Sequence, residues 1–354
     1  MDTRIFYFSD RLIDIANFRI PIPIHAFIDT TQECNHRCWY CYDYVGYSLG
    51  IKREKSSTPY TPIKDLIYIL EELNTLGIRA YDFCGGEPLY YPHSKELLNA
   101  AANLGVKYGL VTNGTMITGS ILELVANHAC WVRFSIDTID EKLFKKTRRP
   151  ISEQFGSNYV LKNLSSLVSR RKELKRNDFL IGVNCVVDRR HVSSIYDTAF
   201  KLKDIGVDYV IYDFVNAGKS IQSRLYNHDH LELIMNEIHR TMELVDESFQ
   251  IYEPTHESLL NRPNSRKGFS LCYWSLLTLT FDVDGNLYAC PEMKHDERFL
   301  VGNRYDESLS ELVFSHKRWD IAKQINFCSN CCKFNFNAFV ERHLRITPNQ
   351  LPFI

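Results

Sequence analysis

The feature that most constrains this chain is a short loop with three cysteines, CNHRCWYC, at residues 34–41. It follows an apolar segment, residues 25–29, whose composition predicts a short buried strand. A structural zinc site needs four ligands, and a fully ligated [4Fe-4S] cluster needs four cysteines. Three thiols without an evident fourth would leave one iron of a [4Fe-4S] cluster open to another ligand. The loop therefore predicts a cluster with one open iron.

Three further motifs follow the loop: Gly-Gly-Glu-Pro at 85–88, Thr-Asn-Gly at 112–114 and Ser-Ile-Asp at 135–137. Each motif is weak alone. In this order, the loop and the motifs resemble the radical S-adenosylmethionine (SAM) superfamily, in which a CxxxCxxC loop holds the cluster and SAM binds the open iron. The metal ligands that the resemblance implies are Cys34, Cys38 and Cys41. The alternative is a zinc site with His36 as the fourth ligand, which the accompanying motifs disfavour.

Length and charge limit the classes of protein that need to be considered. At 354 residues, we expect one principal domain and a smaller appended one. A formal net charge of −1, with acids and bases interspersed, gives no reason to expect nucleic acid or a membrane as the main partner. The first twenty residues carry several charges, so no signal peptide is expected. We therefore expect a cytoplasmic protein whose eleven cysteines serve metal or redox chemistry.

Predicted strands and helices alternate through the first two thirds of the chain. The strands are expected at 25–29, 80–84, 107–111, 131–136, 179–187 and 209–214, and the helices at 61–76, 94–104, 118–127, 159–174 and 192–205. This alternation indicates βαβ units and a parallel α/β sheet. The six strands match the partial (β/α)6, TIM-like barrel that the resemblance implies, although the pattern alone also fits a doubly wound open sheet. In either fold, ligands bind beyond the carboxyl ends of the strands.

The resemblance implies SAM contacts at these strand ends. Gly85 and Gly86 permit close backbone approach, and Glu87 would receive the SAM amino group. Ser135 and Asp137 share one side of a strand, where a carboxylate can accept from the ribose hydroxyls. The remaining predicted contacts are Tyr40 near the adenine, Thr112, Asn113, Arg148 or its neighbour Arg149 with the SAM carboxylate, and Asn184 with SAM or substrate.

A second group of cysteines lies in the last third of the chain. Cys272 and Cys290 enclose a predicted hairpin with an Asp-Gly corner at 284–285, and CSNCC at 328–332 follows a predicted helix, 309–325. Four thiolates there suit either zinc or a [4Fe-4S] cluster, and the spacing does not decide between them. By resemblance to the SPASM/twitch branch of the superfamily, we predict a small cysteine-rich, twitch-type extension with one auxiliary [4Fe-4S] cluster. Its ligands would be Cys272, Cys290, Cys328 and Cys331, with Cys332 as the alternative to Cys331.

The predicted organisation therefore has five parts. They are a leader at 1–24, the core barrel at 25–217, a linker with a helical segment at 218–270, the twitch-like auxiliary domain at 271–335 and a tail at 336–354. With 33 residues before the first cysteine of the loop, a separate peptide-recognition domain ahead of the barrel is not expected.

The resemblance implies an oxidoreductase of the radical SAM type. A flavodoxin- or ferredoxin-type donor would reduce the first cluster, and cleavage of SAM would yield a 5′-deoxyadenosyl radical that abstracts hydrogen from an unactivated C–H bond. Most enzymes of this branch modify peptides, so we expect crosslinking, oxidation or epimerisation of a peptide. The alternative substrate is a polar small molecule, namely a sugar, aminocyclitol or nucleoside in antibiotic-type biosynthesis.

Two further alternatives follow from the cysteines. Epimerisation needs a hydrogen donor, and the unassigned thiols are Cys84, Cys130 and Cys185, with Cys185 singled out because it neighbours Asn184 on a strand. Core packing is the more common use of such cysteines. A protein of another class, a non-catalytic iron-sulfur or zinc scaffold, is disfavoured because the open-iron loop and Glu87 are intact.

Overall fold

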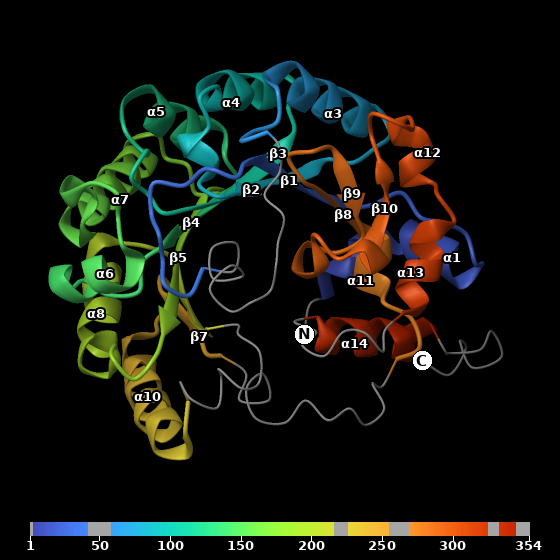
Figure 1. Ribbon diagram of the computed structural model, residues 1–354. Helices are drawn as coiled ribbons and strands as arrows, with labels where there is room; N and C mark the ends of the chain where they lie inside the picture. Colours follow the sequence, from blue (N-terminus) through green and yellow to red (C-terminus); the bar gives the residue numbers. More distant parts are fainter. Residues whose placement is uncertain (1–2, 42–57, 216–225, 255–268, 325–332, 345–354) are drawn as a thin grey trace.

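The computed structural model describes residues 3–41, 58–215, 226–254, 269–324 and 333–344, and Figure 1 shows that they build one curved sheet with helices outside it. The strand order is β10-β9-β8-β1-β2-β3-β4-β5-β6-β7, and β1 to β7 are all parallel. The parallel strands are β1 (His25–Thr31), β2 (Ala80–Gly85), β3 (Lys107–Thr112), β4 (Trp131–Ser135), β5 (Leu180–Val187), β6 (Tyr209–Phe214) and β7 (Gln250–Tyr252). The expected α/β fold with a mostly parallel sheet is confirmed.

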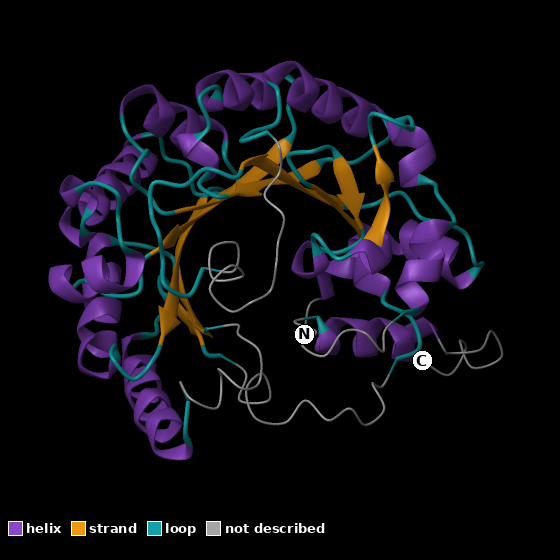
Figure 2. Cartoon of the chain, in the orientation of Figure 1, coloured by secondary structure: helices purple, strands orange, loops and turns teal. Residues whose placement is uncertain are grey.

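Helices cover the convex face of this sheet (Figure 2). They are α3 (Ile63–Thr75), α4 (Ser94–Asn103), α5 (Gly119–His128), α6 (Glu141–Arg148), α7 (Ser157–Glu173), α8 (Ile195–Ile205) and α10 (His228–Thr241). Alternate strand residues such as Ile28, Phe83 and Phe134 are at most 1% exposed and pack in one core with the helices. Because successive strand residues point to opposite faces, their neighbours line the concave face. We call the space bounded by this face the lumen.

Two elements of the barrel region were not predicted from the sequence pattern. Strand β7 lies within the predicted linker and extends the parallel sheet beyond β6, so seven parallel strands replace the expected six. Helix α6 lies between β4 and α7, and only one of its apolar residues, Phe144, is fully buried. The strand is only three residues long, and the helix is only eight residues long and mostly charged, so neither contains enough apolar residues to be recognised in the sequence.

The predicted C-terminal hairpin is present and continues the same sheet. Its strand β8 (Thr278–Phe281) pairs in parallel with β1, while β9 (Asn286–Tyr288) and β10 (Leu300–Asn303) follow antiparallel. Gly285 at the corner has φ +80°, which glycine adopts without strain. The predicted single helix after the hairpin is two short ones, α12 (Leu309–Val313) and α13 (Lys317–Lys323).

The two ends of the described chain meet in a second, smaller core. It contains apolar residues of α1 (Ser9–Ala16), of α11 (Tyr273–Leu277), of α13 and of α14 (Phe334–Leu344), including Leu12, Leu276 and Val340. A short 3-10 helix, Thr3–Phe8, precedes α1. The predicted leader, auxiliary domain and tail therefore share one core.

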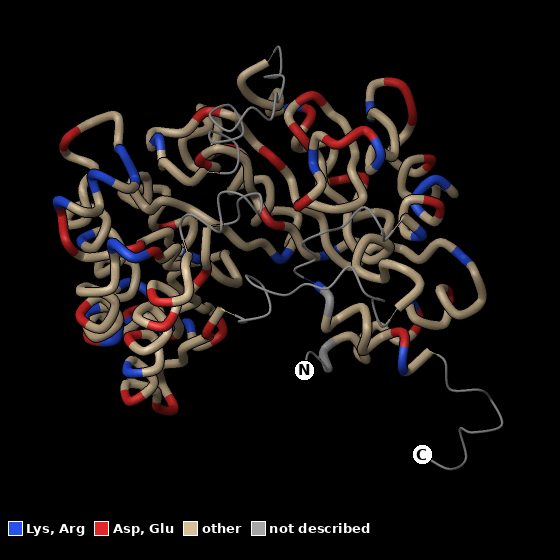
Figure 3. The backbone as a smooth tube through the Cα atoms, turned by 60° about the horizontal axis from the view of Figure 1, so that its bottom comes forward, with Lys and Arg blue, Asp and Glu red and all other residues tan. Residues whose placement is uncertain are grey.

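Charged residues of both signs are interspersed along the described chain, as Figure 3 shows. None of the helices in the part of the chain that the structure describes is long and apolar enough to cross a membrane.

Candidate functional site

The three-cysteine loop leaves β1 at the carboxyl edge of the sheet and is held there by the end of α6. Residues 35–39 are joined to residues 147–151 by backbone hydrogen bonds. The N–H of Arg37, for example, donates to the carbonyl oxygens of Arg148 (3.1 Å) and Arg149 (2.9 Å). Helix α6, which the sequence pattern missed, is thus the element that positions the loop.

Gly85 and Gly86 lie against the start of the loop. A Cβ on Gly85 would stand 2.2 Å from the carbonyl oxygen of Thr31, and one on Gly86 would stand 2.4 Å from that of Glu33. The N–H of Gly86 also donates to Thr31 O at 2.7 Å. The close approach that requires glycine is therefore to the chain entering the cysteine loop, and the predicted contact of these glycines with SAM stays a prediction.

Glu87 connects the ends of two neighbouring strands. Its carboxylate accepts hydrogen bonds from Thr112 Oγ1 (2.6 Å), the N–H of Asn113 (2.6 Å) and the N–H of Leu89 (3.2 Å), and the residue is 1% exposed. Burial raises the pKa of Glu87 to about 7, although these hydrogen bonds favour the charged form. The structure thus brings Glu87, Thr112 and Asn113 into contact with one another, and their predicted contacts with SAM stay predictions.

Asn113 extends this group to the first cysteine. Its Nδ2 donates to Asn35 Oδ1 at 2.6 Å and lies 3.9 Å from Cys34 Sγ. The N–H of His36 donates to the same sulfur at 3.4 Å. Cys34 therefore has polar N–H groups on two sides, which suits a thiolate ligand.

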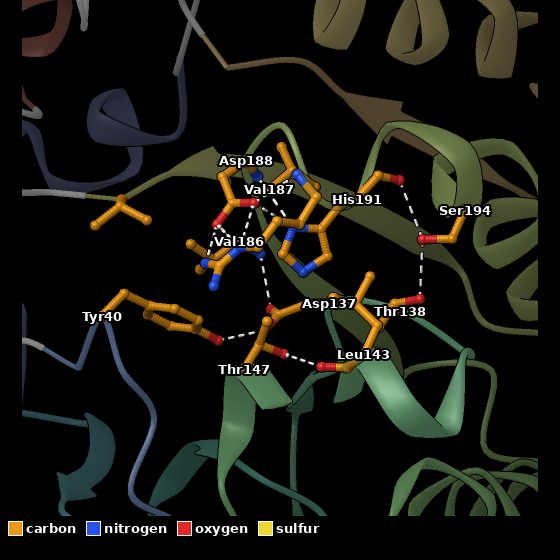
Figure 4. Close-up of polar contacts among 12 residues, drawn as sticks. Tyr40, Asp137, Thr138, Leu143, Thr147, Val186, Val187, Asp188, His191 and Ser194 are labelled. Atoms are coloured by element: carbon orange, nitrogen blue, oxygen red, sulfur yellow. Dashed lines mark hydrogen bonds and ion pairs between the residues drawn. The ribbon is translucent and has the colours of Figure 1, made fainter. Parts of the chain in front are cut away.

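The side chains of Tyr40, Asp137 and Arg148 form a hydrogen-bonded group beside the second cysteine, and Figure 4 shows the contact of Tyr40 with Asp137. Asp137 Oδ1 accepts from Arg148 NH2 at 2.5 Å and from the N–H of Val186 at 2.9 Å, while Asp137 Oδ2 accepts from the Tyr40 hydroxyl. Arg148 NH1 lies 4.0 Å from Cys38 Sγ. The predicted roles of these residues toward SAM stay predictions, because the structure pairs Asp137 and Arg148 with each other.

A contact that sequence reasoning missed holds Trp39, inside the loop. The Arg190 guanidinium lies 4.3 Å from the centre of the Trp39 ring and binds the Asp188 carboxylate after β5. Burial opposes the charged form of Asp188, yet hydrogen bonds from Arg190 and His191 hold the pKa of this carboxyl below its ordinary value. Nothing in the local pattern distinguished Arg190 from a solvated basic residue.

Ser135 and Asn184 pair in register on adjacent strands and both face the lumen, as expected for residues that meet a ligand there. Cys185 lies on the opposite face: it is 0% exposed, packs in the helix core and donates to Ile136 O at 2.9 Å. This placement does not support the predicted hydrogen-donor role of Cys185. Cys84 on β2 is the unassigned thiol on a lumen-facing position, half-buried.

The three loop thiols are the predicted ligands of the cluster. Among the described residues, no three His, Cys, Asp or Glu side chains are grouped so as to hold one metal ion. A cubane spaces its ligands farther apart, because each cysteine binds a different iron. Burial raises the pKa of Cys34 and of Cys38 to about 12, so iron binding must displace their protons. The side chain of His36 lies against Phe144, with ring centres 5.9 Å apart.

Of the predicted auxiliary ligands, the structure describes Cys272 and Cys290, both half-buried, whereas Cys328, Cys331 and the alternative Cys332 lie outside the described residues. Cys272 directly precedes α11, and Asn337 Nδ2 on α14 lies 3.7 Å from its sulfur. The auxiliary cluster and its ligand set stay predictions.

Comparison with known proteins agrees with this geometry. Residues 28–184 match the family model "Radical SAM superfamily". An S-adenosylmethionine-dependent nucleotide dehydratase of Lacinutrix mariniflava is 31% identical over 34% of this chain and 25% of its own length. Residues 28–184, which include the cysteine loop and most of the parallel sheet, are thus similar to the radical SAM superfamily.

Other relatives match nearly the whole chain. The antilisterial bacteriocin subtilosin biosynthesis protein AlbA of Bacillus subtilis is 22% identical over 88% of this chain and 65% of its own length. The mycofactocin maturase MftC of Mycolicibacterium smegmatis is 24% identical over 86% of this chain and 74% of its own. The structure of Streptococcus suis SuiB bound to precursor peptide SuiA aligns with a TM-score of 0.65 at 15% identity, covering 91% of this chain and 74% of SuiB. The chain is therefore related to proteins of this kind. It spans between a quarter and three quarters of the length of the curated relatives that it matches.

Proposed function

We propose that this chain is a radical SAM enzyme that modifies a peptide. The observation that carries the proposal is the placement of the cysteine loop: residues 34–41 stand at the carboxyl edge of a parallel sheet, docked on α6, with Glu87, Asn113, Asp137 and Arg148 gathered beside the thiols. This is the edge at which parallel α/β folds bind their ligands. Cys34, Cys38 and Cys41 would hold the [4Fe-4S] cluster, and SAM would bind its open iron.

When bound, the cluster and SAM supply reductive cleavage of SAM and hydrogen abstraction from an unactivated C–H bond of the substrate. The protein's own residues position these groups. Arg148, which Asp137 orients, places a fixed positive charge beside Cys38. The Glu87 network fixes the ends of β2 and β3, and Tyr40 is fixed through its hydroxyl. Such preorganisation lowers the cost of placing reactants.

The coverage of the comparisons favours a peptide over a nucleotide. The alignment with the nucleotide dehydratase covers only 34% of this chain. The alignments with the subtilosin and mycofactocin proteins cover 88% and 86% of it and so extend beyond the barrel. The similarity that extends beyond the barrel is thus to proteins named for maturation of peptide products. We propose crosslinking, oxidation or epimerisation of a peptide, with a flavodoxin- or ferredoxin-type electron donor.

The auxiliary [4Fe-4S] cluster is part of this proposal. Cys290 follows β9, and the β8–β9 register places it near the first residue of β8, whereas the cysteine loop follows the last residues of β1. Because β1 and β8 are parallel neighbours, Cys290 and the cysteine loop lie at opposite ends of the same pair of strands. A second cluster there would accept an electron from a substrate during net oxidation.

The test is iron content and SAM cleavage after anaerobic reconstitution. We expect about eight irons per chain in the wild type and about four, with cleavage lost, in a variant with Cys34, Cys38 and Cys41 changed to Ala. The matched control changes Cys130, which is half-buried beside β4, to Ala and should keep both iron and cleavage. Cleavage that survives in the triple variant would refute the proposal. A wild type with about four irons, all lost in the triple variant, would remove the auxiliary cluster and the oxidative reaction.

A further inference from the structure

One arginine in the lumen forms neither a hydrogen bond nor an ion pair with any residue that the structure describes. Arg133 lies on β4 two residues before Ser135, half-buried, on the face away from the helix core. Among the described residues it has no hydrogen bond or ion pair, and its Nε is a buried donor without a partner. Other sheltered arginines use at least part of the guanidinium: Arg171 binds Asp208, and Arg318 binds carbonyl oxygens, although the Nε of Arg318 is also unpartnered.

Aromatic rings hold Arg133 in place. Its guanidinium carbon lies 5.2 Å from the centre of the Trp131 ring and 5.9 Å from that of the Tyr209 ring. Two glycines make room for these rings: a Cβ on Gly109 would stand 2.0 Å from Trp131, and one on Gly182 would stand 2.2 Å from Tyr209. Contacts with ring faces restrain the guanidinium but do not use its N–H donors, which lie at its edge. The arginine is therefore restrained with its donors available.

The neighbouring strands carry two polar groups next to it. Asn184 on β5 has a buried Oδ1 without a partner among the described residues, and its side chain hydrogen-bonds to Asp213 on β6. Asp213 forms no ion pair with Arg133 within 4 Å in the described structure, although the two charges interact. Desolvation raises the pKa of Asp213 above its ordinary value, whereas Asn184 and the charge of Arg133 lower it.

We propose that Arg133 binds a carboxylate of the peptide substrate, with Asn184 beside it to receive a substrate N–H. The planar fork of a guanidinium matches a carboxylate through two parallel hydrogen bonds, and it includes the Nε that is unpartnered here. Arg133 lies one inward-facing position below Ser135, so a residue held there would lie directly beneath the proposed SAM site. The inference rests on the proposed function and names its substrate chemistry: an Asp or Glu side chain, or a chain-terminal carboxylate.

Binding of three small probes tests this inference on the reconstituted protein with SAM. The probes are N-acetyl-glutamate α-amide for a side-chain carboxylate, N-acetylglycine for a terminal carboxylate, and neutral N-acetyl-glutamine α-amide. Calorimetric titration should show one or both acids binding about tenfold more tightly than the amide, the scale of one charged hydrogen-bonded pair. Whichever acid binds more tightly identifies the source of the carboxylate.

Variants assign the effect to Arg133. Arg133→Gln should abolish the preference for the acid, Arg133→Lys should keep part of it, and Arg170→Gln on the outer surface of α7 should keep all of it. Equal binding of acid and amide by the wild type, absence of binding by all three probes, or a preference that survives in Arg133→Gln would each overturn the inference. SAM cleavage is measured in the same samples. A wild type that does not cleave SAM would refute the proposed function. If the wild type does cleave SAM, the binding data alone decide whether Arg133 binds a carboxylate. Should Arg133→Gln fail to fold, the comparison of Arg133→Lys with the wild type decides.

Discussion

The buried pair of Asp137 and Arg148 offers the sharpest test of how the site is held together. Their side chains are 0% and 6% exposed, and the Asp137 carboxylate also accepts from Val186 N–H and the Tyr40 hydroxyl. In Asp137→Asn, the charge of Arg148 would lose its buried counter-charge. Removing one partner of such a pair typically costs about 3–5 kcal/mol. Because the Asn oxygen can still accept one hydrogen bond, we expect the free energy of unfolding to fall by about 3 kcal/mol.

Urea unfolding followed by circular dichroism, under anaerobic conditions, measures this loss. The matched control is Glu123→Gln, which breaks the pair of Glu123 with Arg170, 49% and 33% exposed, and should cost less than about 1 kcal/mol. The double variant Asp137→Asn with Arg148→Met removes both charges and should cost less than the sum of the two single changes. A loss in Asp137→Asn no greater than in the surface control, or strict additivity in the double variant, would refute the reasoning.

Three other changes test separate parts of the structure. Gly182→Ala should lower stability by about 1–3 kcal/mol in the same urea assay, because its Cβ would overlap the Tyr209 ring; unchanged stability would show that the ring does not lie on the sheet. The pKa of Asp188 is lower in the folded chain than its ordinary value of about 3.9, so its ionised carboxylate stabilises the fold above that pH. This contribution is lost as the pH falls from about 3.9 through the pKa of the folded state. Asp188→Asn should therefore flatten the acid side of a plot of unfolding midpoint against pH. Asn337→Ala, which removes an N–H donor 3.7 Å from Cys272, should make the potential of the auxiliary cluster more negative in a redox titration monitored by electron paramagnetic resonance, and an unchanged potential would argue against Cys272 as a ligand.

The local pattern was sufficient for the elements with a strong hydrophobic period. Helix α3 and strand β6, for example, begin and end within two residues of the predicted bounds, because their buried positions recur at the expected spacing. Strand β7 and helix α6 were missed because one is three residues long and the other is mostly charged. Both are stabilised by tertiary packing that no local pattern records.

The candidate site shows the same division. The cysteine loop and its accompanying motifs were readable because their residue types and order are specific to one chemistry. The partners of those residues were not: Asp137 and Arg148 were assigned separately to SAM, yet they bind each other. The glycines at 85 and 86 were assigned to a ligand, yet a Cβ on either would first meet the backbone of residues 31–33.

By itself, the sequence determined the class of fold, the position of the cysteine loop after the first strand and the resemblance of residues 28–184 to the radical SAM superfamily, because alternation and motif spacing are properties of consecutive residues. Only the tertiary structure decided which residues of a strand face the lumen, placing Asn184 there and Cys185 in the core. It also joined the hairpin to β1 and left the Nε of Arg133 in the lumen without a hydrogen-bond partner among the described residues. These features depend on contacts between segments far apart in the chain, and such contacts are set by packing.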